Sequence, residues 1–228
     1  MKKLIPALLT ALVVLAGCHK QDSYTYSGIE AGSIASGVFT SDNGTRMNVV
    51  GNEGKYDVTT ARRVLVSYET RPLTDPARTD IDILGLLDAG ILQPGHVDTL
   101  PEDPSGSPLQ VSDAWFSKEY LNILATFDGK DAGKHTFIAS YLVDEKGISI
   151  RLDHDGTQDT AAGNEPLSIF LCIPMYEPVL SYDQHAQSSG NKPVYPAPVL
   201  LQWTARTLEG GPLTLLERKG SYQPSADN

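Results

Sequence analysis

The sequence is short of positive charge and of cysteine. It has 18 lysine and arginine residues against 28 aspartate and glutamate residues, a formal net charge of −10, and only two cysteines. Nucleic-acid binding rests on clustered lysine and arginine side chains that neutralise phosphates, so this excess of carboxylates argues against a nucleic-acid partner. Two cysteines allow one disulfide at most, so burial of apolar side chains must supply the stability of the fold.

Short motifs of common chemistries are also missing. There is no Gly-x-Ser-x-Gly, no phosphate-binding glycine loop, no dinucleotide fingerprint and no His-Glu-x-x-His. Ser41-Asp42-Asn43 and Ser189-Gly190-Asn191-Lys192 match two β-lactamase motifs, but in reversed order and without a following Lys-Thr-Gly. Hydrolysis by two facing carboxylates stays open, because such a pair has no sequence signature. We therefore predict no catalytic residue and no cofactor.

The first apolar run is too short to cross a membrane. Lys2 and Lys3 precede a twelve-residue stretch, Leu4–Leu15, whereas a helix that spans the hydrocarbon core takes roughly twenty residues. Leu15-Ala16-Gly17-Cys18 resembles a bacterial lipobox, which implies cleavage before Cys18 and lipidation of that cysteine. We predict a signal peptide at 1–17 and an exported, outer-membrane-anchored lipoprotein that faces the periplasm or the cell surface. The alternative is an ordinary secretory signal with an incidental cysteine.

If Cys18 carries lipid, the other cysteine, Cys172, has no disulfide partner. It lies in a strand-like run, Leu167–Ile173, and no basic residue or histidine is near it in the sequence. We therefore expect a buried thiol that packs as a small apolar side chain, and not a nucleophile.

The first half of the mature chain predicts β structure. Residues 18–33 are small and polar, as in a lipidated tether. Asn43-Gly44 between two apolar runs predicts a hairpin, because both central positions of that turn need positive φ. Arg63–Glu69 predicts a strand, and Ile81–Leu92 a further apolar stretch whose spacing also suits a short helix. The first domain is expected at 34–93, followed by a proline-rich linker at 94–108.

The second half predicts a β-sandwich over 109–220, with a flexible tail at 221–228. Six strand-like runs are separated by turn-rich segments: Trp115–Phe127, Thr136–Val143, Ile148–Asp153, Leu167–Ile173, Val199–Thr207 and Leu213–Arg218. Residues 181–198 contain Ser188, Ser189 and Gly190 and predict a long loop.

An ordered series of segments resembles the NigD-like lipoproteins of anaerobic diderm bacteria of gut and mouth. The resemblance implies an all-β fold, with an N-terminal OB-type barrel followed by a C-terminal antiparallel β-sandwich. It implies no catalytic residues, and the family's link to a bacteriocin gene cluster implies a bacteriocin-associated or immunity-related role. The 181–198 segment departs from the compact family pattern. The matching segments are Gly44–Arg46, Arg63–Tyr68, Ile81–Leu84, Val111–Trp115, Glu119–Ile123, Gly133–His135, Ile150–Asp155 and Leu167–Leu171.

Two groups of polar residues are candidate metal ligands. Asp153, Asp155 and Asp159 surround a glycine turn and could offer oxygens to Ca²⁺, but the twelve-residue loop with a final glutamate is missing. A polar connection between strands is the favoured interpretation. His135 and His154 fall at strand ends and could meet across the sheet, yet two histidines alone rarely form a metal site. We predict no metal.

For function, the sequence leaves two classes of binding protein. The leading hypothesis is a non-catalytic envelope lipoprotein that binds a protein or peptide, and the alternative is a glycan-binding surface lipoprotein. A sugar site needs exposed ring faces beside polar groups. Trp115, Tyr120 and Trp203 are the large rings of the second domain, and each is expected in the core. We expect Trp115 and Trp203 to be buried, which favours a protein partner.

Overall fold

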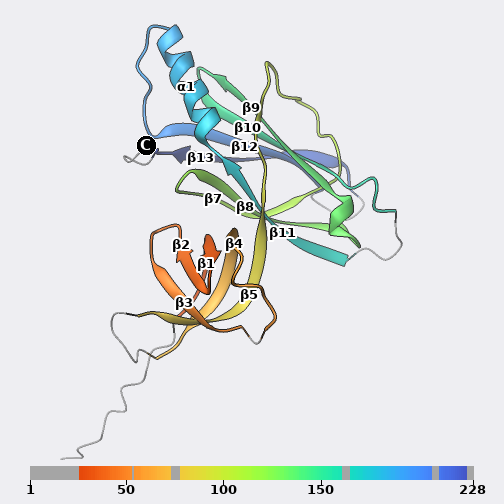
Figure 1. Ribbon diagram of the computed structural model, residues 1–228. Helices are drawn as coiled ribbons and strands as arrows, with labels where there is room; N and C mark the ends of the chain where they lie inside the picture. The colour runs from red at the N-terminus through yellow and green to blue at the C-terminus, as the bar shows by residue number, and fades with distance from the viewer. Residues whose placement is uncertain (1–25, 53, 73–77, 161–164, 207–210, 225–228) are drawn as a thin grey trace, which may run out of the picture.

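The structure is a computed structural model that describes residues 26–52, 54–72, 78–160, 165–206 and 211–224. The predicted signal peptide, 1–17, and the predicted lipidation site, Cys18, lie outside these residues. Almost all of the regular structure is strand, as Figure 1 shows. The strands are β1 (Ser27–Ala35), β2 (Val38–Ser41), β3 (Arg46–Gly51), β4 (Arg62–Thr70), β5 (Asp80–Ile91), β6 (Gly95–His96), β7 (Gln110–Ser117), β8 (Tyr120–Gly129), β9 (Thr136–Asp144), β10 (Gly147–Asp155), β11 (Glu165–Pro174), β12 (Ala197–Arg206) and β13 (Leu213–Tyr222), with the helices η1 (Ala132–Lys134) and α1 (Tyr176–Ser188).

The first five strands close into a barrel. β1 pairs with β2 and β4, β2 with β3, and β4 with β5, all antiparallel, and a parallel pairing of β3 with β5 completes the ring. This is the strand order of an OB-type barrel. Alternate residues point inward, so each strand contributes every second side chain to one core. That core contains Ile34, Phe39, Met47, Val64, Val66, Tyr68, Ile81 and Ile83.

The predicted tether over 18–33 is wrong in its second half, because β1 begins at Ser27. The small residues of β1 allow the neighbouring strands to pack closely, and they do not make this segment a flexible tether. A Cβ atom on Gly32 would lie 2.3 Å from the backbone oxygen of Thr40, so the barrel admits only glycine at this crossing. Small side chains in a sequence suit both a tether and a tightly paired strand.

The predicted hairpin at Asn43-Gly44 is confirmed, with β2 and β3 paired around it. Its turn differs in detail from the expected one. The Gly44 amide donates to the Ser41 carbonyl, so Asp42 and Asn43 are the central residues of the turn. Neither has positive φ, whereas Gly44, the last residue of the turn, has φ of 91°. The turn places Asp42 at the tip of the barrel that faces the second half of the chain.

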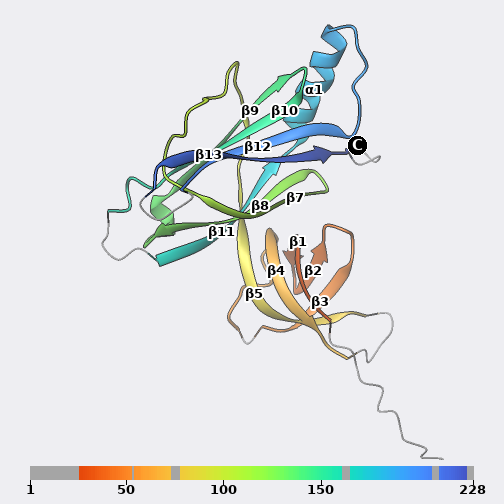
Figure 2. The same cartoon turned by 180° about the vertical axis from the view of Figure 1, so that it is seen from behind.

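The second half is a sandwich of two sheets (Figures 1 and 2). One sheet runs β5-β11-β8-β7 and continues the barrel sheet through β5, and the other runs β13-β12-β10-β9-β6. Their shared core includes Leu121, Ile123, Ile150, Leu152 and Trp203. The predicted all-β fold, barrel before sandwich, is confirmed. The sandwich is mixed, however, because β12 runs parallel to β10 and β11 parallel to β5.

The loop predicted over 181–198 is wrong, because α1 occupies its first part. Pro178 is tolerated in the first turn, where backbone N–H groups have no partner within the helix. The Ser-Gly-Asn run that suggested a loop is the helix stop. Gly190 has φ of 72° and its amide donates to the Gln187 carbonyl, while Asn191 donates to Ala186. No helix in the described ranges is both long and apolar enough to cross a membrane.

Residues 94–108, the predicted linker, form a strap along the second sheet. β6 pairs with β9, and the Ser107 and Leu109 amides donate to the His154 and Thr204 carbonyls. Under this strap lies Arg151, fully buried, which donates to Asp153, Ser105 and Thr204. The chain is thus packed where it passes from barrel to sandwich, and the exact domain limits remain a prediction.

Candidate functional site

The barrel and the sandwich meet as two diverging walls. Period-two alternation places every second residue of a strand on its outer face. On β4, the neighbours of the inward-pointing Val64, Val66 and Tyr68 therefore face outward, toward the sandwich. On β8, the residues between Leu121, Ile123, Ala125 and Phe127 of the sandwich core face the barrel. From the joint outward, the facing series are Arg63, Leu65, Ser67 and Glu69 on β4, and Asn122, Leu124, Thr126 and Asp128 on β8.

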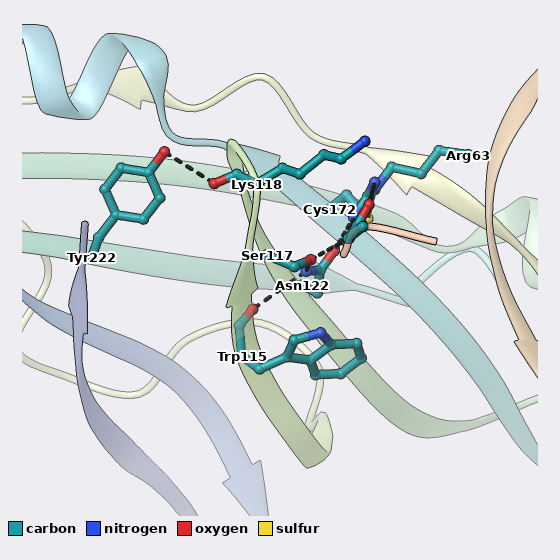
Figure 3. A network of polar contacts seen from close by, with 8 residues as sticks. Arg63, Trp115, Ser117, Lys118, Asn122, Cys172 and Tyr222 are labelled. Carbon is teal, nitrogen blue, oxygen red and sulfur yellow. Dashed lines mark hydrogen bonds and ion pairs between the residues drawn. The ribbon is translucent and has the colours of Figure 1, made fainter. Parts of the chain in front are cut away.

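At the joint, Arg63 ties the two walls together (Figure 3). Its Nη1 and Nη2 atoms donate to the two carboxylate oxygens of Asp42 at 2.8 and 2.7 Å. Nη2 also donates to Asn122 Oδ1 at 2.7 Å, and Nε donates to Cys172 Sγ at 3.1 Å. Arg63 and Asp42 belong to the barrel, whereas Asn122 and Cys172 belong to the sandwich. One guanidinium therefore holds both units.

Further contacts hold the Asp42 carboxylate and complete the cluster. The Ser117 hydroxyl donates to Asp42, and Asn122 Nδ2 donates to Ser117 Oγ at 2.5 Å. The guanidinium carbon of Arg63 lies 4.2 Å from the ring centroid of Tyr120, a cation–π contact. This is where the structure places Tyr120, so the ring is not an exposed sugar platform.

The pKa of the Asp42 carboxyl lies below its ordinary value of 3.8. Burial alone would raise it, but hydrogen bonds from Arg63 and Ser117 and the positive charge of Arg63 outweigh burial. Because the folded pKa is the lower one, Asp42 stabilises the fold above about pH 3.8 and loses this contribution as the pH falls further.

Cys172 is a free, buried cysteine, as predicted. Burial raises the pKa of its thiol above the ordinary 9.0, and the hydrogen bond from Arg63 opposes this only in part. The thiol is therefore protonated at neutral pH and donates to Asn122 Oδ1 at 3.2 Å. Its basic neighbour comes from a strand 109 residues away, so sequence proximity could not reveal it.

Next to the cluster, apolar side chains of the barrel and the sandwich pack against each other. Ala31 and Leu65 of the barrel pack with Phe170 and Cys172 of β11. The Trp115 ring stacks on Phe170, with centroids 6.0 Å apart. Trp115 is only half-buried, so the prediction of a fully buried ring is wrong for it. Trp203, 6% exposed, is buried as expected.

Farther out, the walls enclose a groove of about 480 Å³, here called the joint groove. None of the described residues that line it is charged. Gly85, at a bulge in the pairing of β4 with β5, leaves room for it because no side chain projects there. Its lining comes from β1, β4, β5, β7, β8, β11 and the segment before β4: Ile29, Tyr56, Leu65, Ser67, Gly85, Leu86, Leu87, Ser112, Leu124, Thr126 and Ser168.

The second polar cluster confirms that His135 and His154 meet. His135 Nδ1 lies 2.8 Å from His154 Nε2, and the other ring nitrogens contact Asp159 Oδ2 at 3.2 Å and the Pro108 carbonyl at 3.2 Å. A carbonyl only accepts, so His154 Nδ1 is the donor to Pro108. A neutral His154 then accepts at Nε2 from His135. These contacts connect Pro108 of the strap, His154 at the end of β10, His135 before β9 and Asp159 in the loop after β10.

Burial lowers the pKa of His154 below its ordinary value of 6.5, and the neighbouring His135 lowers it further, against the opposing hydrogen bond to Pro108. The ring stacks on Phe137 with centroids 4.7 Å apart. These surroundings favour the neutral ring and a structural role.

The three aspartates considered as Ca²⁺ ligands go to separate partners. Asp153 accepts from Arg151, Asp155 accepts from the Thr157 amide in its own turn, and Asp159 accepts from the Lys130 and Asp131 amides. Across the part of the chain that the structure describes, no group of three histidine, cysteine or acidic residues is placed to hold a metal ion.

The β-lactamase-like motifs are also separated. Ser41-Asp42-Asn43 forms the β2–β3 turn, where Asp42 is committed to Arg63. Ser189 and Lys192 follow the end of α1, which packs on β9 and β10. Neither motif reaches the joint groove.

No protein-family model matches the sequence, and no curated protein matches it either. Solved structures do. A NigD-like immunity protein from Bacteroides caccae is 19% identical, with TM-score 0.57 over 88% of this chain and 97% of that chain. A protein of unknown function from Bacteroides vulgatus is 13% identical, with TM-score 0.56 over 89% and 93%. A protein from Bacteroides fragilis that is described as a lipoprotein is 12% identical, with TM-score 0.58 over 88% and 100%. At the level of the fold, these likenesses confirm the resemblance to NigD-like lipoproteins.

The Arg63 cluster predicts a large cost for removing one partner. Arg63→Met leaves the buried Asp42 carboxylate without its cation, which should lower the free energy of unfolding by about 3–5 kcal/mol. Arg62→Met is the matched control, since Arg62 pairs with the exposed Asp88 and should cost less than about 1 kcal/mol. Urea denaturation measures both. Equal losses in the two variants would contradict the assignment.

The buried histidine pair predicts a pH-dependent stability. Because the folded pKa of His154 is lowered, the unfolded chain binds its proton more readily, so the free energy of unfolding should fall as the pH drops below about 6.5. His154→Gln should be less stable at pH 7.5 and show a slope that is shallower by up to about 1.4 kcal/mol per pH unit. His185→Gln, on α1, is the control and should retain the slope. Parallel curves for His154→Gln and the unsubstituted protein would refute the assignment.

Proposed function

We propose that this chain is a non-catalytic lipoprotein of the cell envelope that binds a protein or peptide in the joint groove. The lining of that groove carries the proposal. Among the described residues it consists of aliphatic and hydroxyl side chains with a single ring, and these include no acid, base or thiol. A serine needs an adjacent base to act as a nucleophile. An open apolar surface with scattered hydroxyls suits contact with a partner better than chemistry.

The placement of the large rings supports a peptide over a sugar. Trp203 is buried, Trp115 stacks on Phe170, and Tyr120 lies against Arg63. Glycan binding remains the second candidate, because Tyr56 lines the groove together with Ser67 and Thr126. One ring offers a single stacking face.

The proposed location in the cell envelope rests on the first eighteen residues and on similarity to solved structures. The lipobox-like sequence supports lipidation at Cys18, and anchoring in the outer membrane is proposed with it; a similar solved structure is described as a lipoprotein. Another similar structure is named a NigD-like immunity protein, which supports a bacteriocin-associated or immunity-related role for this chain.

The proposed anchor is tested by Cys18→Ala in the full chain. We expect the protein to move from the membrane fraction to the soluble fraction, because no lipid can be attached. Ser23→Ala, in the same segment, is the control and should leave the protein with the membranes. If the Cys18→Ala protein still sediments with membranes, another element anchors it.

The proposed binding function is tested by presenting both ligand classes to the full chain in a non-ionic detergent. A random ten-residue peptide library should yield ligands that bind saturably, while a glycan array should not. A fluorogenic panel of peptide, ester and glycoside substrates should show no turnover. Saturable binding to one oligosaccharide class with no peptide ligand would favour the second candidate.

A further inference from the structure

From the charges around the joint groove we infer that its partner is a cationic amphipathic peptide segment, with apolar side chains on the floor and lysine or arginine at the mouth. This inference rests on the proposed binding function and specifies its ligand.

The floor of the groove sets the apolar part of the ligand. Ile29 is 68% exposed although it lies within β1, and on the paired strand β4 it is opposite Ser67. Leu87 is opposite Leu65, and Leu124 opposite Phe170. An apolar surface that stays open on a folded monomer marks a contact site. Covering it removes apolar area from water, at about 25 cal/mol per Å².

Free hydroxyls on the walls suit a polypeptide backbone. Thr126 and Ser168 are register partners on β8 and β11, and Ser67 faces Gly85 on the barrel wall. Within the described residues, the hydroxyls of Ser67, Thr126 and Ser168 make no side-chain hydrogen bond, whereas that of Ser112 donates to the Leu124 carbonyl. An extended peptide has amide groups that need partners when it leaves water, and these hydroxyls can supply them.

The mouth of the groove is acidic on both walls. Glu69 follows Ser67 on the outer face of β4, and Asp128 follows Thr126 on β8, both exposed. Neither makes an ion pair with a described residue. The neighbour of Glu69 in register, Asp82, is already paired with Arg71, and the neighbour of Asp128 is the uncharged Pro166.

At the opposite end of the groove, the charge of Arg63 is already paired. Its guanidinium donates to the Asp42 carboxylate and to the side-chain carbonyl of Asn122. A ligand would therefore meet an uncharged floor and two unpaired carboxylates, on a chain with a formal net charge of −10. Such a field attracts cationic segments and repels anionic ones.

The test measures fluorescence anisotropy of two labelled ten-residue peptides with the full chain in a non-ionic detergent. One peptide alternates leucine and lysine, and the other alternates leucine and glutamate. We expect saturable binding of the lysine peptide, weakened by salt, and at least tenfold weaker binding of the glutamate peptide. Equal binding of both peptides, or no binding of the lysine peptide, would overturn the cationic assignment.

Substitutions locate the site. Ser168→Trp fills the groove from the sandwich wall and should weaken lysine-peptide binding at least tenfold, and Thr126→Trp provides a second filling variant if the first does not fold. Glu69→Gln with Asp128→Asn should weaken it about fivefold, the scale of two exposed ion pairs, and flatten its salt dependence. Ser221→Trp and Glu145→Gln, both exposed and on the other sheet or its turn, should bind as the unsubstituted protein does.

The outcomes separate this inference from the proposed function. If library peptides bind but Ser168→Trp leaves their affinity unchanged, peptide binding stands, whereas its location in the joint groove and this inference both fail. If only glycans bind, the proposed function itself fails. Retained affinity in the Glu69→Gln, Asp128→Asn double variant would refute the role of the acidic mouth.

Discussion

The relation between the two halves of the molecule depends on one buried ion pair. Arg63 and Asp42, whose side chains are 11% and 8% exposed, form a two-point contact within the barrel and together reach into the sandwich. A buried charge is tolerated only when it is paired and hydrogen-bonded, so the joint admits few other arrangements. The fixed joint holds β4 and β8 together at one end, and their divergence beyond it creates the joint groove.

Much of the fold can be predicted from short-range patterns, because those patterns act through neighbours in the chain. Short apolar runs predict the strands near Arg63–Glu69 and Leu167–Ile173, and Asn43-Gly44 predicts the first hairpin. Two local patterns mislead. Gly32 is small because a neighbouring strand passes close to it, and Gly190 ends a helix instead of belonging to a loop. Glycine is common in tethers and loops, but also at close strand crossings and at helix ends, and only tertiary packing decides between these structures.

The candidate site could not be predicted in the same way. Arg63 and Cys172 are 109 residues apart, and Asp42 belongs to a turn that gives no sign of burial. The sequence shows only that Arg62 and Arg63 come before the apolar residues of β4. The meeting of His135 with His154 was predictable, since both fall at strand ends. The floor of the groove was not, because it combines residues from seven segments whose order in space depends on closure of the barrel.

Strand β5 belongs to both units, since it closes the barrel against β3 and β4 and then pairs with β11 through Ala89, Gly90 and Ile91. A strand shared in this way leaves no flexible hinge between the walls of the groove, and the packed strap that follows it adds none. The walls therefore hold one width before anything enters. The conformational entropy lost on association falls on the ligand alone, so short or stiff segments, which have little to lose, are favoured over long flexible ones.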